Sequence, residues 1–113
     1  LVEKDRLRSG FWISAQVRLC DQAFIPVVVL HKGDPDAGAI LLKLNRLAAG
    51  CEVLTQVRNL DGTPAWMRGT GEAPVKEEDA DAYIVRQRGR DPDLWVLEIE
   101  DPDHRYEFDG EII

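Results

Sequence analysis

Apolar side chains recur at helical spacing near the start of the chain. Spacings of four, three and four residues separate the members of this apolar stripe, which are Ile13, Val17, Cys20 and Phe24. Such spacing places them on one face of an α-helix that packs on a core. Ser9 precedes the stripe and is a residue type that caps helix N-termini. The pattern predicts a helix over residues 10–23.

A run of apolar residues follows that helix. Pro26 ends the helix, and residues 27–30 are then Val, Val, Val and Leu without interruption. Uninterrupted apolar runs are typical of strands covered on both faces. We therefore expect residues 27–31 to form a strand near the centre of the sheet. The Gly- and Asp-rich segment 33–38 then predicts a turn.

Two further segments, 40–45 and 51–58, alternate between apolar and polar residues. The expected inward residues are Ile40, Leu42, Leu44, Cys51, Val53, Thr55 and Val57. The expected outward residues are Lys43, Asn45, Glu52, Gln56 and Arg58. Alternation of this kind predicts an antiparallel pair with one face in water. Asp61-Gly62 is a strong hairpin signal, and it leads to a strand over residues 65–68.

The last third of the chain predicts a second helix and a final strand. Pro74 and the acidic residues 77–79 suit a helix start, and Gly89 suits its end. Residues 94–100 read as a strand, and residues 105–108 as a short edge strand. The expected fold is a single α+β domain, 1–113, in the order α-β-β-β-β-α-β. Its sheet is mostly antiparallel, with four to six strands and both helices packed on one face.

Composition supports one soluble domain. The 113 residues are 44% hydrophobic and 31% charged, which is ordinary for a globular chain. No apolar run approaches the roughly 20 residues that span a bilayer, so we expect no membrane association. Residues 1–70 carry a net charge of +2 and residues 71–113 a net charge of −9. The acidic C-terminal third disfavours nucleic-acid binding.

Two cysteines indicate the compartment. Cys20 and Cys51 lie far apart, without CxxC spacing, inside apolar-periodic segments. They are expected to be buried free thiols rather than a disulfide framework. A reducing, cytoplasmic location follows from this interpretation.

Carboxylates offer one candidate chemistry. Asp-Pro-Asp occurs at 34–36, 91–93 and 101–103. Clustered carboxylates bind hard cations, but Asp and Pro are also the residues of tight turns, and we favour turns. Asp34, Asp36 and His31 are weak metal-ligand candidates, and with them a small metal-assisted hydrolase is one alternative function. A phosphate-binding loop at 33–38 is disfavoured because a strand, not a helix, follows it. We expect no cofactor.

Basic and aromatic residues on the central strands offer another candidate. The set is Lys43, Arg58, Trp66 and Arg68. If their outward faces coincide, they form a basic patch that could bind an acidic peptide, a carboxylate or stacked bases. The leading hypothesis is a non-enzymatic binding module with a homodimer or another protein as partner. Nucleic-acid binding through this basic strand face is a further alternative.

Three stretches carry a family resemblance: RSGFW at 8–12, GDPDAGAILLK at 33–43 and DPDLWVLEIED at 91–101. LTQ at 54–56, WMR at 66–68 and AYI at 82–84 also fit. Together they resemble the bacterial domain-of-unknown-function family 1491 over nearly the whole chain. The resemblance implies a small, stand-alone, cytoplasmic bacterial protein without assigned activity, and it brings no catalytic residues with it.

Overall fold

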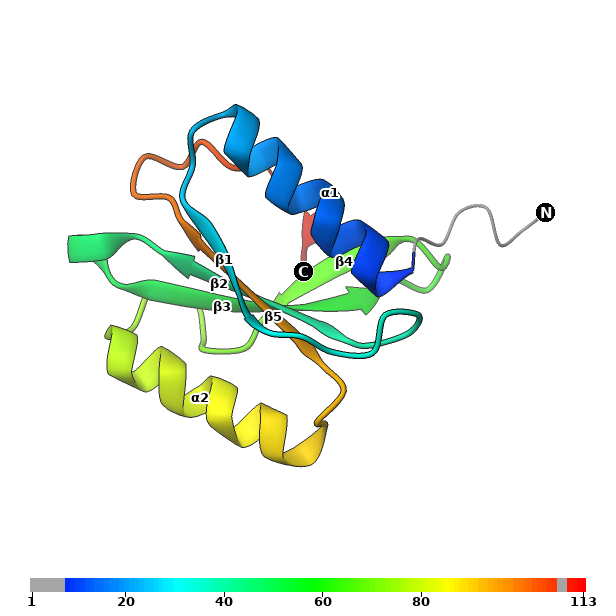
Figure 1. The fold of residues 1–113 in the computed structure, drawn as a ribbon. Helices are drawn as coiled ribbons and strands as arrows, with labels where there is room; N and C mark the ends of the chain where they lie inside the picture. Colours follow the sequence, from blue (N-terminus) through cyan, green and yellow to red (C-terminus); the bar gives the residue numbers. More distant parts are fainter. Residues whose placement is uncertain (1–7, 108–109) are drawn as a thin grey trace.

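The computed structural model describes residues 8–107 and 110–113. Two helices and six strands follow in the order α1 Ser9–Gln22, β1 Val27–His31, β2 Ile40–Asn45, β3 Cys51–Arg58, β4 Pro64–Arg68, α2 Glu77–Arg90, β5 Trp95–Glu100 and β6 Glu111–Ile112 (Figure 1). A short 3₁₀ turn, η2 Leu47–Ala49, joins β2 to β3. The predicted order of elements is confirmed. No helix among the described residues is long and apolar enough to cross a membrane.

The sheet is mixed, which corrects the expectation of a mostly antiparallel sheet. Its strand order is β1-β5-β2-β3-β4-β6. β5 runs antiparallel to β1 but parallel to β2, and β6 runs parallel to β4. The cause is the return of the chain after α2, which inserts β5 between β1 and β2. Periodicity within a strand does not indicate which neighbour the strand will pair with, so the sequence pattern missed this insertion.

The helices cover opposite faces of the sheet, and the expectation that both pack on one face is wrong (Figure 1). Leu42 and Trp66 belong to the core beneath α1, together with Trp12. Leu41 and Val53 belong to a second core, beneath α2, together with Ile84. The alternation along β2 and β3 therefore distinguishes two buried faces. The face expected to lie in water is covered over these strands.

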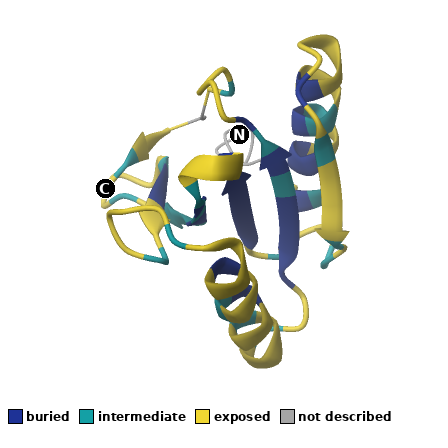
Figure 2. Ribbon diagram, turned by 90° about the vertical axis from the view of Figure 1, so that its left-hand side faces the viewer, coloured by how far each residue is buried: buried dark blue, intermediate teal, exposed yellow. Residues whose placement is uncertain are grey.

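β1 lies at the edge of the sheet, not near its centre. Within the described residues it pairs only with β5, and three of its five residues are exposed. Figure 2 shows the central strands in dark blue and β1, at the right-hand edge, largely in yellow. An apolar run predicted a strand covered on both faces, but β5, which carries Glu98 and Glu100, occupies the central place instead.

Element boundaries shift by a few residues from their predicted places. α1 starts at Ser9, whose Oγ donates to the carbonyl of Gly38, so Ser9 does not cap the helix. α2 starts at Glu77 instead of Pro74 and continues through Gly89 to Arg90. Residues 105–107 form no strand, position 108 lies outside the described residues, and the short edge strand is β6.

Trp66 is a core residue. Its side chain is fully buried, and its ring lies 5.6 Å from that of Trp12, centroid to centroid, with the planes tilted by 45°. The pair joins β4 to α1. Tilted aromatic pairs of this kind add to the stabilisation that comes from burying their area.

Replacing Trp66 with alanine should lower the free energy of unfolding by about 3–5 kcal/mol, because a large cavity opens beneath α1. The neighbouring Met67→Ala is a matched control, since Met67 is 50% exposed. It should change stability by no more than about 0.5 kcal/mol. Urea unfolding followed by circular dichroism measures both. Equal losses in the two variants would contradict this role for Trp66.

Candidate functional site

The structure separates the basic and aromatic residues that the sequence suggested as one patch. Leu54 belongs to the core beneath α1 and pairs with Arg68 in register. Since side chains alternate along a strand, Arg58 and Trp66 point to that same face. Lys43 points to the opposite face, where α2 lies. The expected patch does not form, because its members lie on two faces and two of them are buried.

Arg58 and Arg68 are the accessible members of that set. Arg58 donates from Nη1 to the carbonyl of Gly62 at 2.6 Å. Arg68 Nε lies 3.7 Å from Glu52 Oε1, and its side chain is 38% exposed. Both guanidinium groups are thus engaged locally, one in the β3–β4 turn and the other in a cross-strand ion pair.

Lys43 is the centre of a buried charge cluster, although the strand pattern predicted that its side chain faces water. Its side chain is 3% exposed. Nζ lies 2.8 Å from Glu77 Oε2, 2.7 Å from Asp81 Oδ1 and 3.7 Å from Glu98 Oε1. Burial opposes protonation, but hydrogen bonds to Asp81 and Glu77 outweigh it, so the pKa of Lys43 lies above its ordinary value. The ammonium group attaches the first turns of α2 to β2.

A second buried charge cluster lies at the ends of β2 and β5. Arg46 donates from Nη1 to the Asp101 carbonyl at 2.7 Å and to its Oδ2 at 3.1 Å. The Asp101 carboxylate also accepts the backbone N–H groups of Arg105 and Tyr106. Burial would raise the pKa of Asp101, but these backbone bonds and Arg46 outweigh it and hold it below its usual value. The sequence showed Asp101 only as a turn residue.

The carboxylate-rich loop serves the fold. Asp34 Oδ2 accepts the backbone N–H groups of Asp36 and Ala37 at 3.2 and 2.8 Å, which is the turn geometry predicted for this tripeptide. His31 Nδ1 lies 2.7 Å from the carbonyl oxygen of Leu94. Among residues 8–107 and 110–113, no group of three or more His, Cys, Asp or Glu side chains could hold a metal ion. The weak metal candidates do not converge.

The glycine-rich segment 33–38 packs against the strand that follows α2. Asp34 N–H donates to the Asp93 carbonyl at 2.8 Å, and Trp95 Nε1 donates to the Asp34 carbonyl at 2.8 Å. A Cβ atom at Gly33 or Gly38 would collide with the Asp93 carbonyl, so glycine is required there by close approach. Gly10 N–H donates to the Pro35 carbonyl at 2.9 Å. The three stretches that carry the family resemblance therefore meet in one structural seam.

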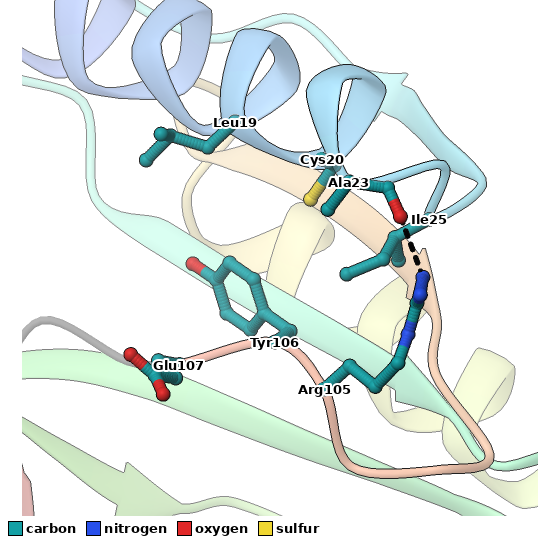
Figure 3. Close-up of a pocket in the computed structure, with 7 residues that line it drawn as sticks. All are labelled: Leu19, Cys20, Ala23, Ile25, Arg105, Tyr106 and Glu107. Atoms are coloured by element: carbon teal, nitrogen blue, oxygen red, sulfur yellow. Dashed lines mark hydrogen bonds between the residues drawn. The ribbon is translucent and has the colours of Figure 1, made fainter.

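Both thiols are buried and free, as predicted. Cys20 faces a hollow of about 230 Å³ between α1 and residues 105–107 (Figure 3). Burial, with the charges of Asp101 and Asp21, raises the pKa of Cys20 to about 11. The thiol is therefore protonated at neutral pH and is a poor nucleophile. Beside the hollow, Tyr106 Oη donates to Gln16 Oε1 at 2.7 Å.

The free edge of β1 is the feature that the fold leaves open. Glu100 N–H donates to the Pro26 carbonyl at 2.9 Å, and pairing continues with Val27 opposite Ile99 and Val28 opposite Glu98. Hydrogen-bonded and non-hydrogen-bonded pairs alternate along an antiparallel ladder. Val28 therefore bonds to β5, while the N–H and C=O groups of Val27 and Val29 point away from the sheet.

The side chains along this edge are apolar and accessible. Val28 is 50% exposed, Val29 37% and Leu30 44%. A register shift between Val29 and His31 ends the regular pairing. Edge strands usually carry charges or proline inside the strand, which prevent pairing with other chains. Between Pro26 and Lys32, β1 has no such residue apart from His31 at its end.

Phe24, just before β1, adds an exposed ring to this edge. It is 89% exposed and adopts a positive φ of 59°. Ile25 N–H donates to the Cys20 carbonyl at 2.8 Å and Phe24 N–H to the Asp21 carbonyl at 3.2 Å. These two bonds form a Schellman motif, in which glycine is the usual residue at the position of Phe24. The chain thus presents an aromatic ring at a strained position.

The fold and the site define a small mixed-sheet α+β domain with two buried charge clusters and an open apolar strand edge. The chain belongs to the family described as protein of unknown function (DUF1491), whose model matches residues 7–109. No curated protein sequence is significantly similar to it.

Several solved structures are similar to this protein over most of the chain. A crystal structure of a DUF1491 family protein from Caulobacter crescentus CB15 has a TM-score of 0.84 and 32% identity, and the match covers 96% of this chain and 100% of that one. An NMR structure of a DUF1491 family protein from the same organism has a TM-score of 0.80 and 32% identity, with 95% and 96% covered. Protein Atu0922 from A. tumefaciens has a TM-score of 0.71 and 27% identity, with 84% and 86% covered.

Lys43→Met should lower the free energy of unfolding by about 1–3 kcal/mol, less than for a fully buried pair, because half-exposed Glu77 and Asp81 can turn to water. Lys76→Met, at an exposed position, should change it by no more than about 0.5 kcal/mol. Because the pKa of Lys43 is raised in the folded state, its contribution to the free energy of unfolding is complete at pH values below the unfolded-state pKa of about 10.4. That contribution declines as the pH rises above this value. Urea unfolding at several pH values measures this. A Lys43→Met variant as stable as the wild type would contradict it.

Phe24→Gly should raise the free energy of unfolding by about 0.5–1 kcal/mol, because glycine adopts the positive φ without strain. Phe24→Ala removes the ring but keeps the strained backbone, so it should bring no gain. Thermal unfolding of both variants separates the two effects. Equal stabilisation by both would show that the ring, and not the backbone, is responsible.

Proposed function

We propose that this protein is a non-enzymatic interaction module that binds an extended chain segment along the free edge of β1. The observation that carries the proposal is a strand of five residues with apolar, exposed side chains and outward backbone groups at Val27 and Val29. An extended segment added there would satisfy these groups and cover the apolar side chains. Strand addition to an exposed sheet edge is a common mode of peptide recognition.

The opposite edge of the sheet is less suited to such binding. β6 has two residues, of which Glu111 is exposed and Ile112 half-buried. Short, charged edge strands resist pairing with other chains. Asn59 Nδ2 also donates to Glu111 Oε2 at 3.1 Å, which ties this edge to the β3–β4 turn. The two edges therefore differ in length and in polarity, and β1 is the open one.

The chemistry of the described residues supports a binding role over catalysis. Cys20 carries a raised pKa, and His31 and Asp34 both contact backbone groups of the fold. Lys43 is held by three carboxylates. Each of these potentially reactive groups thus serves packing, whereas the outer edge of β1 pairs with no other strand among the described residues.

The test is a nuclear magnetic resonance titration of the labelled protein with a synthetic peptide of residues 24–32. We expect the peptide to shift the amide resonances of Val27 and Val29 most strongly and to slow their hydrogen exchange. The same peptide N-methylated at every residue except Pro26 has no backbone donor on either edge, and it should have no effect.

Two variants locate the binding. Val29→Pro removes an outward N–H group but no bond to β5, so it should weaken peptide binding at least tenfold. Arg58→Glu reverses an exposed charge on β3, and it should leave binding unchanged. Shifts confined to residues around Arg58 and Arg68, or no shifts at β1, would overturn the proposal.

A further inference from the structure

We propose that the chain segment seated on β1 is β1 of a second copy of this protein, paired antiparallel across a twofold axis at Val28. This inference rests on the proposed function and names its partner. The two copies would form one continuous sheet. Interfaces of this type are isologous, with the same surface on both molecules.

The backbone groups of the edge are self-complementary in this register. Val27 and Val29 present their N–H and C=O groups outward, as the β1–β5 ladder requires. Centring the axis on Val28 places Val27 of each copy opposite Val29 of the other. Each such pair exchanges both of its hydrogen bonds, as antiparallel ladders do at alternate positions. The pairing of the two β1 strands thereby satisfies the outward N–H and C=O groups of both copies.

Charge also favours a second copy at this edge. The protein carries a net charge of −7, so two molecules repel each other over most approaches. Residues 22–33 contain no Asp or Glu, and Lys32 is their one Lys or Arg. The strand itself therefore brings no carboxylate to the junction, and Glu98, which pairs with Val28, lies on β5, one strand behind the edge. In the proposed register the end of one strand, with Lys32, approaches the start of the other, with the exposed ring of Phe24.

The side chains agree with the same arrangement. A twofold axis perpendicular to the sheet keeps α1 of both copies on one side and α2 of both on the other. Val28 then meets Val28 of the second copy, and Leu30 meets Pro26. These are the exposed apolar residues that β1 otherwise leaves in water. A junction made by one short strand of each copy is small. Because interfaces below about 1,200 Å² are usually weak and transient, we expect a reversible dimer.

Cysteine cross-linking tests the register. Val28 pairs with its own equivalent at a non-hydrogen-bonded position, where Cα atoms lie about 4.5 Å apart, within disulfide range. Val28→Cys should therefore form an intermolecular disulfide under mild oxidation. Leu30→Cys, on the same edge but opposite Pro26, should not, and neither should Val85→Cys, which is exposed on α2. The native thiols are buried and should not compete.

Sedimentation of the protein without any introduced cysteine, over a range of concentrations, tests the association itself. We expect the wild type to show a reversible monomer–dimer equilibrium. Val28→Lys places two ammonium groups opposite each other across the axis, and Val29→Pro removes an outward donor. Each should weaken dimerisation at least tenfold. Circular dichroism will check that both variants fold. The control Arg58→Glu should dimerise like the wild type.

The outcomes distinguish the partner from the binding mode. A wild type that stays monomeric at millimolar concentration, while the peptide of residues 24–32 still binds at β1, would overturn the second copy and retain the strand-binding edge. Disulfides in Leu30→Cys or Val85→Cys at the rate of Val28→Cys would overturn the register. Absence of both dimer and peptide binding would overturn the proposed function as well.

Discussion

The parallel pairing of β2 with β5 is the constraint on which the rest of the structure depends. Both strands are apolar at four of six positions, and their residues are buried or half-buried on both faces. Such a pair needs a helix on each side, because neither face can be left to water. α1 and α2 accordingly cover opposite faces. The same pairing places Lys43 directly opposite Glu98, so a charge pair lies at the centre of the sheet.

Two consequences of this arrangement concern stability and binding. Lys43 cannot reach water through the covered face, so α2 must provide carboxylates, and Glu77 and Asp81 of its first turns do so. β1, displaced by β5, has a neighbouring strand on one side only within the described part of the chain. An apolar sequence that would suit a central strand is therefore exposed at an edge. The central pairing thus explains both the buried cluster and the open edge.

The seam around residues 33–38 shows why a family pattern need not indicate chemistry. Its glycines allow close approach of the backbone to Asp93, and its aspartates close turns. Trp95 on β5 holds the same loop through its indole N–H. The residues that make this family recognisable thus align the start of α1, the β1–β2 connection and the start of β5. The stretches that carry the family resemblance thus contribute to the assembly of the sheet.

Local interactions explain which features could be predicted from the sequence. Helical spacing, the Asp61-Gly62 turn and the order of elements depend on residues close together in the chain, and the elements they predicted were confirmed. The helical stripe was wrong at its last member, because Phe24 lies beyond the end of α1 and is exposed. Strand alternation also separated Leu42 from Lys43 correctly. It could not show that both faces are covered, because a lysine beside carboxylates from α2 has the same local pattern as a lysine in water.

Only the tertiary structure decided which strands pair and which side chains pack together. The amino-acid sequence by itself determined the elements and their order along the chain, the burial of both thiols and the family. Long-range pairing decided that β5 lies between β1 and β2, that Trp66 packs on Trp12, and that the open surface is an edge instead of a basic face. The physical reason is that periodicity records whether a side chain meets water or protein, but not which segment of the chain covers it.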